Sequence, residues 1–232
     1  MFMQGRDFCD RLQKLLAARH GDIGNKSDFF RSAVLLPLVD TAEGLAVLFE
    51  VRSGNLAWQP GEICFPGGRI EASDQSALAA AVRETAEELG LAPAQIRPLG
   101  PLDWVIGQIG VLLYPFVGYL AADVADLKPN REEVAEVFTV PLVWLLAAQP
   151  QVGHMEMATR PLSDFPFHLL ADYSPDWKPR ITYPVWFYQY GARVIWGLTA
   201  RVLKGFLDLC REMERPSENL PTNPSKICLP DR

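Results

Sequence analysis

Cysteine and histidine are both scarce: the chain of 232 residues has four cysteines and three histidines. The cysteines stand far apart, at positions 9, 64, 210 and 228, whereas zinc sites use closely spaced ligand pairs. This spacing excludes a typical zinc site, and we expect Cys64 to be a small buried apolar residue rather than a nucleophile. Low cysteine usage favours a reducing compartment, so we predict a cytoplasmic location.

Basic residues are outnumbered by acidic ones, 22 to 28, which gives a formal net charge of −6. A protein that binds a nucleic acid polymer needs a basic footprint, so this balance excludes that class of partner. A single nucleotide-like ligand needs only a few local cations and is compatible with the composition. Apolar residues make up 49% of the chain, which is enough for a substantial core and argues against global disorder.

The N-terminus has no apolar run of the kind found in signal peptides. Two stretches lack charged residues, 104–122 and 137–155, and both are long enough to span a membrane. Glycine, proline and glutamine interrupt these stretches. We therefore interpret them as buried strands and a short helix, and we predict no membrane partner.

A chain of 232 residues suits one domain of generous size or two small ones. Hydrophobic periodicity predicts its helices and strands. Residues 5–19 are expected to be helical, with Phe8, Leu12, Leu15 and Leu16 on one side. Strands are expected at the β-prone runs 32–39, 44–51, 62–65, 96–105, 111–121, 138–140 and 183–188, the first two forming a hairpin.

The C-terminal third is expected to hold an irregular excursion and then a helix. The excursion covers 149–176, has alternating apolar residues at 165–170 and is expected to contain a hairpin. Residues 191–200 are expected to form the first part of the last helix, with an apolar face made of Ile195, Leu198, Val202, Phe206 and Leu209.

Residues 61–91 hold the most informative pattern, a glycine-containing turn followed by an alanine-rich helix. A proline and two glycines at 66–68 are typical of a turn with unusual backbone angles. Ser73 or Asp74 would cap the start of the helix, and Gly90 would end it. One mostly apolar stripe is expected along the helix, made of Leu78, Val82, Thr85 and Leu89.

Glu84, Glu87 and Glu88 fall on another side of this helix, over an arc of roughly 100° at helical periodicity. Like charges at these spacings destabilise an isolated helix. A solvated face, helped by Arg83 and by screening, would offset the repulsion. A divalent cation would offset it more strongly, because Mg²⁺ prefers oxygen ligands. Helix geometry alone leaves both interpretations open.

The spacing of Gly68, Asp74 and the segment Arg83-Glu84-x-x-Glu87-Glu88-x-Gly90 resembles the signature of the Nudix hydrolases. The interval between Asp74 and Arg83 is one residue longer than in the general pattern. That interval and the preceding Phe-Pro-Gly-Gly resemble the coenzyme A pyrophosphatase branch. One departure is Ala-Trp-Gln-Pro at 57–60, where the branch usually carries a basic residue or histidine.

The resemblance implies an α/β/α sandwich with a mixed β-sheet between helices. It also implies Mg²⁺ or Mn²⁺ as cofactor and an attack of water on phosphorus. Arg83 is expected to orient a carboxylate through an ion pair. The ligands and acid–base groups that the resemblance implies are Gly68, Glu84, Glu87 and Glu88, with Glu133 or Glu136 as a further ligand or general base.

Three residues are candidates for substrate contacts, and each keeps a structural alternative. Arg52 is either a surface arginine or a phosphate or base contact, because its guanidinium donors match phosphate oxygens. Trp58 either stacks on a base or packs on its own loop. Gly67 lies in the turn itself. Glu133 has an alternative too, as part of a solvated turn that begins a strand.

The implied substrate is coenzyme A or an acyl-coenzyme A, cleaved to 3′,5′-ADP and 4′-phosphopantetheine or its acyl derivative. The departure at 57–60 leaves ADP-ribose, dinucleoside polyphosphates and NADH as alternatives. A further alternative is a catalytically silent nucleotide-binding domain that regulates a partner. We expect a small nucleoside diphosphate derivative as the partner of a monomer or homodimer. The expected domains are an N-terminal helix and linker at 1–25, the Nudix domain at 26–215 and a disordered tail at 216–232.

Overall fold

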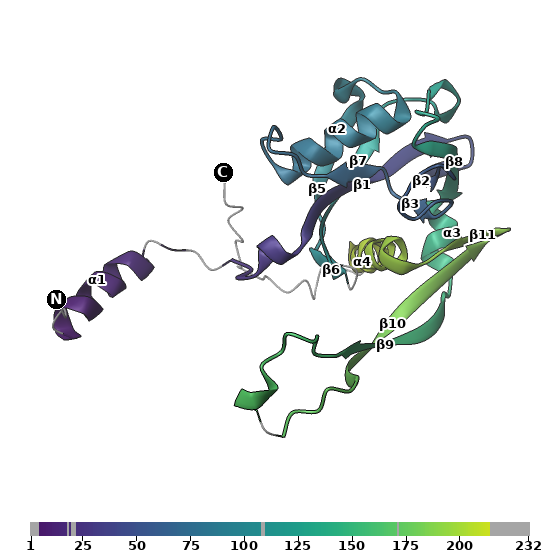
Figure 1. The fold of residues 1–232 in the computed structure, drawn as a ribbon. Helices are drawn as coiled ribbons and strands as arrows, with labels where there is room; N and C mark the ends of the chain where they lie inside the picture. Colours follow the sequence, from purple (N-terminus) through teal and green to yellow (C-terminus); the bar gives the residue numbers. More distant parts are fainter. Residues whose placement is uncertain (1–4, 18, 20–21, 108–109, 171, 214–232) are drawn as a thin grey trace.

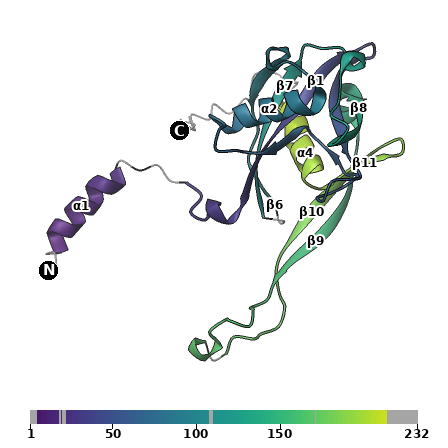
Figure 2. The ribbon, with the colours of Figure 1, turned by 45° about the horizontal axis from the view of Figure 1, so that its top comes forward.

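The computed structural model describes residues 5–17, 19, 22–107, 110–170 and 172–213 of the chain. Helix α1 (Gly5–Ala17) stands away from the other elements in two views (Figures 1 and 2). This helix confirms the prediction for the N-terminal segment, although it ends at Ala17. The predicted tail at 216–232 lies outside the described residues.

A mixed sheet of eight strands forms the centre of the molecule. Strands β1 (Phe30–Thr41) and β7 (Val111–Leu120) run parallel, and the other pairs are antiparallel. The main path of paired strands runs in the order β3 (Ile63–Cys64), β2 (Gly44–Arg52), β1, β7 and β5 (Ile96–Pro101). Three further strands pair outside this path: β4 (Gly67–Arg69) with β1, β6 (Val105–Gly107) with β7, and β8 (Val134–Pro141) with β2. The predicted β1–β2 hairpin is confirmed, with Thr41 opposite Gly44.

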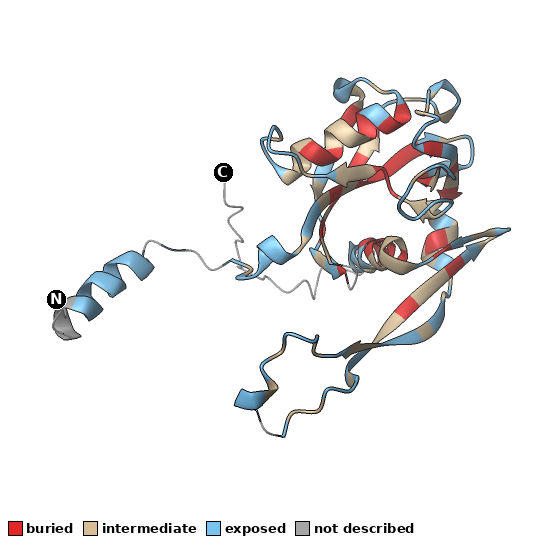
Figure 3. Cartoon of the chain, in the orientation of Figure 1, coloured by how far each residue is buried: buried red, intermediate tan, exposed pale blue. Residues whose placement is uncertain are grey.

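Helices cover both faces of this sheet, α2 (Ala77–Leu89) on one side and α4 (Gly197–Met213) on the other (Figure 1). Each helix closes a separate buried cluster, because successive residues of a strand point to opposite faces. On β2, Ala46 and Leu48 belong to the α2 cluster, whereas Val47 and Phe49 belong to the α4 cluster. Figure 3 shows the buried residues gathered in these layers. The predicted sandwich is therefore confirmed.

A second sheet of three strands, β9 (Gln151–Thr159), β10 (Lys178–Tyr190) and β11 (Arg193–Ile195), packs against α4 through β10. Its two long strands extend well beyond the sandwich (Figure 2). The prediction of irregular structure in 149–176 is wrong for its first part, which is strand β9. The predicted hairpin is present, formed by β9 and β10, although β10 begins at Lys178, just beyond the predicted range. A 3₁₀ turn, η4 (Phe167–Leu169), lies between the two strands. Strand β9 pairs with residues about twenty positions or more away, a non-local pairing that local patterns do not reveal.

The two uncharged stretches form strands β6 to β9 and the short helix α3 (Leu142–Ala147), as predicted. Among the described residues, no helix is both long and apolar enough to span a membrane. The cytoplasmic location stays a prediction. The remaining elements are three 3₁₀ turns, η1 (Lys26–Asp28), η2 (Pro93–Gln95) and η3 (Val124–Asp126).

Helix α2 differs from the prediction in its first residue and in its buried face. Ser76 is the N-cap, and its hydroxyl accepts a hydrogen bond from the Ala79 amide at 3.1 Å. Asp74 instead accepts a hydrogen bond from the Glu71 amide. The fully buried residues of the first turns are Ala80 and Ala81, whereas the predicted Leu78 and Val82 are half-buried. The two alanines let the helix approach β1 closely. Gly90 ends the helix, as predicted.

Helix α4 starts later than predicted, at Gly197, because residues 193–195 pair with β10 as strand β11. Ile195 therefore belongs to a strand. Leu209 is 49% exposed, whereas Leu203 and Leu207 are fully buried. Apolar residues occur on more than one side of α4, and the side that is buried depends on where β10 and the sheet lie.

Truncation of two leucines on α4 tests this orientation. Replacing Leu203 by alanine is expected to lower the free energy of unfolding by about 2–5 kcal/mol, because a fully buried side chain is lost. Leu209→Ala, the matched control, is expected to cost less than about 1 kcal/mol. Urea denaturation of both variants measures the difference. Equal losses would contradict the observed orientation of the helix.

Candidate active site

Two adjacent glycines bring the backbone of β4 against the carboxylates of α2. Gly67 has φ 150° and pairs with β1, and a Cβ atom there would collide with the carbonyl of Ala33. A Cβ atom on Gly68 would lie 2.5 Å from the carboxylate carbon of Glu84. Only glycine allows this approach, so the turn and the helix form one site.

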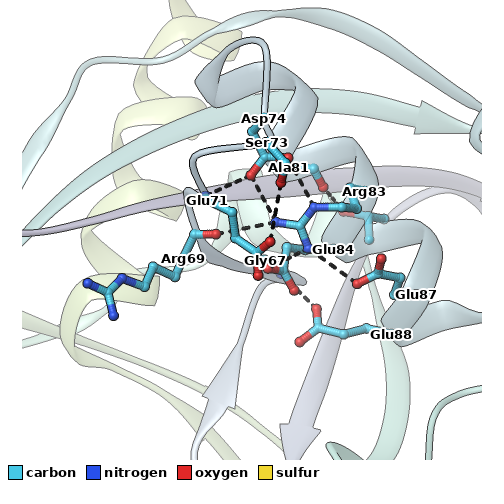
Figure 4. A network of polar contacts seen from close by, with 11 residues as sticks. Gly67, Arg69, Glu71, Ser73, Asp74, Ala81, Arg83, Glu84, Glu87 and Glu88 are labelled. Carbon is cyan, nitrogen blue, oxygen red and sulfur yellow. Dashed lines mark hydrogen bonds and ion pairs between the residues drawn. The ribbon is translucent and has the colours of Figure 1, made fainter.

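Arg83 is the centre of an ion-pair network that joins this turn to α2 (Figure 4). Its guanidinium lies 3.0 Å from Asp74, 3.0 Å from Glu84 and 3.3 Å from Glu87. It also donates a hydrogen bond to the carbonyl of Arg69. The hydrogen bonds from Arg83 lower the pKa of Asp74. The expected ion pair between Arg83 and a carboxylate of the helix is therefore present.

Glu88 points from the same helix into the protein, where only 5% of the residue is exposed. One of its oxygens accepts a hydrogen bond from the Gly67 amide at 2.7 Å. Glu84 is mostly covered and Glu87 is largely exposed, with side-chain exposures of 16% and 58%. The three glutamates thus span the range from solvent to interior, although they lie on one side of one helix.

Sequence analysis missed a fourth carboxylate, that of Glu50 on β2. Only 1% of this residue is exposed, and its Oε1 atom has no hydrogen-bond partner within the described part of the chain. The available signal was the apolar run around it: an acidic residue inside a buried strand is costly unless it has a function.

Glu133 and Glu136 differ in their surroundings. Glu136 forms an ion pair with Arg193 of strand β11. The carbonyl of Glu133 accepts a hydrogen bond from the Ser53 amide at 2.7 Å, which fixes this residue beside the end of β2. Its negative charge raises the pKa values of Glu84 and Glu88. The structure therefore brings Glu133, and not Glu136, into the site.

A cavity of about 440 Å³ opens beside the turn. The predicted residues Arg52, Trp58, Gly67 and Gly68 all line it. The Arg52 guanidinium donates hydrogen bonds to the carbonyl of Trp58 at 3.1 and 3.3 Å. Trp58 is 57% exposed, so its ring is not packed within its own loop. The opposite wall is mostly apolar and includes Leu113, Met155, Val185, Leu198 and Val202.

A family model described as the NUDIX domain matches residues 29–158. The chain belongs to the Nudix hydrolase family. It is 36% identical to the peroxisomal coenzyme A diphosphatase NUDT7 of Mus musculus over 161 residues, which cover 68% of this chain and 67% of that protein. It is 34% identical to the mitochondrial coenzyme A diphosphatase NUDT8 of Homo sapiens over 180 residues, 77% of this chain and 68% of that protein. The Nudix hydrolase NudL of Enterobacter sp. (strain 638) is 30% identical over 200 residues, 85% of this chain and 90% of that protein.

Burial shapes the charges of this Nudix site. Burial raises the pKa of Glu88 to about 8; the hydrogen bond from the Gly67 amide opposes this rise, and the negative charges of Glu84 and Glu133 add to it. Burial also raises the pKa of Glu84, against the attraction of Arg83. The pKa of Glu50 is raised by burial first and then by the charge of Glu88. The buried carboxyl groups of Glu50 and Glu88 therefore favour a bound proton, or a cation in its place.

Cys64 lies opposite Glu50 in the pairing of β2 and β3. It is half-buried by side-chain exposure, and burial together with the neighbouring carboxylates raises the pKa of its thiol. The thiol is therefore neutral, which agrees with the prediction that Cys64 is not a nucleophile.

Nudix hydrolases act with divalent metal ions, and the donor chemistry of this site fits such an ion. The groups beside the turn are carboxylates and backbone carbonyls, which hard cations prefer. An orphaned carboxylate oxygen on Glu50 and a buried Glu88 both gain from a nearby positive charge. No three histidine, cysteine or acidic side chains in the described ranges are grouped closely enough to hold an ion as they stand.

The raised pKa of Glu88 predicts how the stability of the metal-free protein depends on pH. A glutamate in the unfolded chain ionises near 4.5, whereas Glu88 holds its proton up to about pH 8. Between these values the folded state binds more protons, so stability falls as pH rises. In EDTA we expect the Tm to drop by about 4 °C or more from pH 5 to pH 8. Glu88→Gln should reduce the drop, and a Tm that rises over this range would contradict the assignment.

Proposed function

We propose that this chain hydrolyses the diphosphate bond of coenzyme A or an acyl-coenzyme A in the presence of Mg²⁺ or Mn²⁺. Addition of water would release 3′,5′-ADP and 4′-phosphopantetheine, or its acyl derivative. One observation carries the proposal: a single cavity joins the Gly67–Gly68 turn to the mostly apolar wall formed by β10 and α4. A substrate with a diphosphate and a long, weakly polar arm suits such a cavity. The names of two relatives, both coenzyme A diphosphatases, support the same substrate.

The cation would be held by the carbonyl of Gly68 and the carboxylates of Glu84, Glu87, Glu88 and Glu133. When bound, it supplies neutralisation of the phosphate oxygens and acidification of water. Contacts within the chain hold two of these residues near the turn. Glu88 is held by the Gly67 amide, and Glu133 is fixed by its backbone next to β2.

Arg83 acts as a positioning residue in this proposal. Its guanidinium already binds Asp74, Glu84 and Glu87, so it has no free side to offer a substrate. It fixes the rotamers of Glu84 and Glu87 and lowers the repulsion between them. Arg52 and Trp58, in contrast to Arg83, are proposed to contact the substrate directly. Both line the cavity, where a guanidinium can bind phosphate oxygens and an indole can stack on adenine.

Product analysis by mass spectrometry tests the substrate. The purified protein is incubated with Mg²⁺ and, in separate reactions, with coenzyme A, ADP-ribose and NADH, and the series is repeated with Mn²⁺. We expect 3′,5′-ADP and 4′-phosphopantetheine from coenzyme A. Cleavage of ADP-ribose or NADH alone would contradict the proposed substrate and retain the Nudix chemistry. No cleavage of any substrate with either ion would favour the silent binding domain.

Charge-removing substitutions on α2 test the metal site. Glu84→Gln and Glu88→Gln are each expected to lower kcat by about 100-fold or more, because each removes an anionic group from the reacting centre. The Tm should stay unchanged or rise, since each replaces an ionisable group of a repelling set with a neutral one. Glu132→Gln is the control, because this exposed glutamate adjoins Glu133 in the sequence. The turnover of this variant should remain at the wild-type level. Wild-type turnover in both Glu84→Gln and Glu88→Gln would refute the proposed metal site.

A further inference from the structure

Glu50 occupies a position that the strand pattern assigns to the core. Side chains alternate along β2, and Ala46 and Leu48 pack into the cluster beneath α2. The side chain of Glu50, two residues further on, therefore faces α2. It lies in the α2 layer with only 1% of its surface exposed. An apolar side chain would fill this position at no electrostatic cost.

The carboxylate of Glu50 has no partner that would justify its burial. Its Oε1 atom is buried without a hydrogen bond, and no ion pair to Glu50 occurs in the described part of the chain. Arg83 binds three other carboxylates. The charge of Arg52 attracts Glu50, but no hydrogen bond or ion pair joins the two in the described part of the chain, and the Arg52 guanidinium donates to the Trp58 carbonyl. A buried polar group without a partner is destabilising, and a buried charge without one far more so.

Glu88 faces this unpaired carboxylate from α2. The two groups repel each other, the charge of Arg52 offsets part of this repulsion, and Glu133 adds a third negative charge to the same region. Glu88 is itself 5% exposed, so solvent screens this repulsion poorly. A positive charge or a proton shared between Glu50 and Glu88 would relieve the repulsion that remains. A proton or a cation can fill that role, and a hard divalent cation suits paired carboxylates.

We propose that Glu50 is a further ligand of the divalent cation and shares it with Glu88, on the interior side of the glutamates of α2. This inference rests on the proposed metal-dependent function and adds a residue from the sheet to a site otherwise built from α2, the glycine turn and Glu133. Strand β2 then holds the cation from below, while the helix holds it from above.

Direct Mn²⁺ binding, without any substrate, tests this role. Free Mn²⁺ is measured by electron paramagnetic resonance during titration of the wild type, Glu50→Gln, Glu50→Met and Glu43→Gln. Glu43, an exposed residue of the β1–β2 turn, controls for the loss of one negative charge. We expect both Glu50 variants to bind at least one Mn²⁺ about tenfold or more weakly. Glu43→Gln should bind as the wild type does.

Thermal unfolding supplies a second measurement on the same four proteins. In EDTA, Glu50→Gln and Glu50→Met are expected to have a Tm equal to or above that of the wild type, because each removes an ionisable carboxyl group that is buried without a partner. Saturating Mn²⁺ should then raise their Tm less than it raises the wild-type Tm. The methionine variant matches the apolar pattern of β2, so it keeps the test informative if glutamine disturbs folding.

Wild-type Mn²⁺ affinity in either folded Glu50 variant would overturn the inference and leave a shared proton as the role of this carboxylate. Absence of Mn²⁺ binding by the wild type would overturn the metal site as a whole. A wild type that binds Mn²⁺ but does not cleave coenzyme A would contradict the proposed substrate alone. The two proposals therefore fail through different observations.

Discussion

Repulsion among carboxylates is the constraint on which the rest of the site depends. Three glutamates on α2, together with Glu50 below and Glu133 beside them, place five negative groups around one glycine turn. The exposed side of this cluster is neutralised within the protein by Arg83. On the interior side, the Gly67 amide donates a hydrogen bond to Glu88, and Arg52 attracts both Glu50 and Glu88 without forming an ion pair with either in the described part of the chain. The unbalanced charge lies beside the cavity, where a cation and a diphosphate can meet.

The two glycines make this concentration of charge sterically possible. Gly68 lies so close to Glu84 that any side chain would displace the carboxylate, and Gly67 pairs with β1 while its amide holds Glu88. Backbone groups thus take the place of side chains on the inner wall of the site. Because the backbone is fixed by the sheet, the position of Glu88 is set by strand pairing and not by a flexible neighbour.

The Nudix helix and its cation-binding character could be predicted from sequence because they depend on local spacing. Glu50 could not, since its burial follows from α2 packing over β2, and a single acidic residue in an apolar strand gives little warning. The same limit explains strand β9, whose partner is remote, and Leu209, which periodicity assigns to the apolar face but which is 49% exposed among the described residues. Local patterns predict which elements form, whereas long-range packing decides which residues they bury.

Burial of apolar neighbours on strand β2 offsets the free-energy cost of burying Glu50. Full burial of a leucine such as Leu48 stabilises by about 1.5–3 kcal/mol, and an unpaired but neutral polar group costs about 1–3 kcal/mol. One neighbour on the same face therefore offsets a protonated Glu50. An ionised Glu50 costs several kcal/mol more, which a single leucine cannot offset. Glu50 must consequently exchange its proton for another positive charge whenever it ionises, and this coupling ties the interior of the sheet to the occupancy of the site.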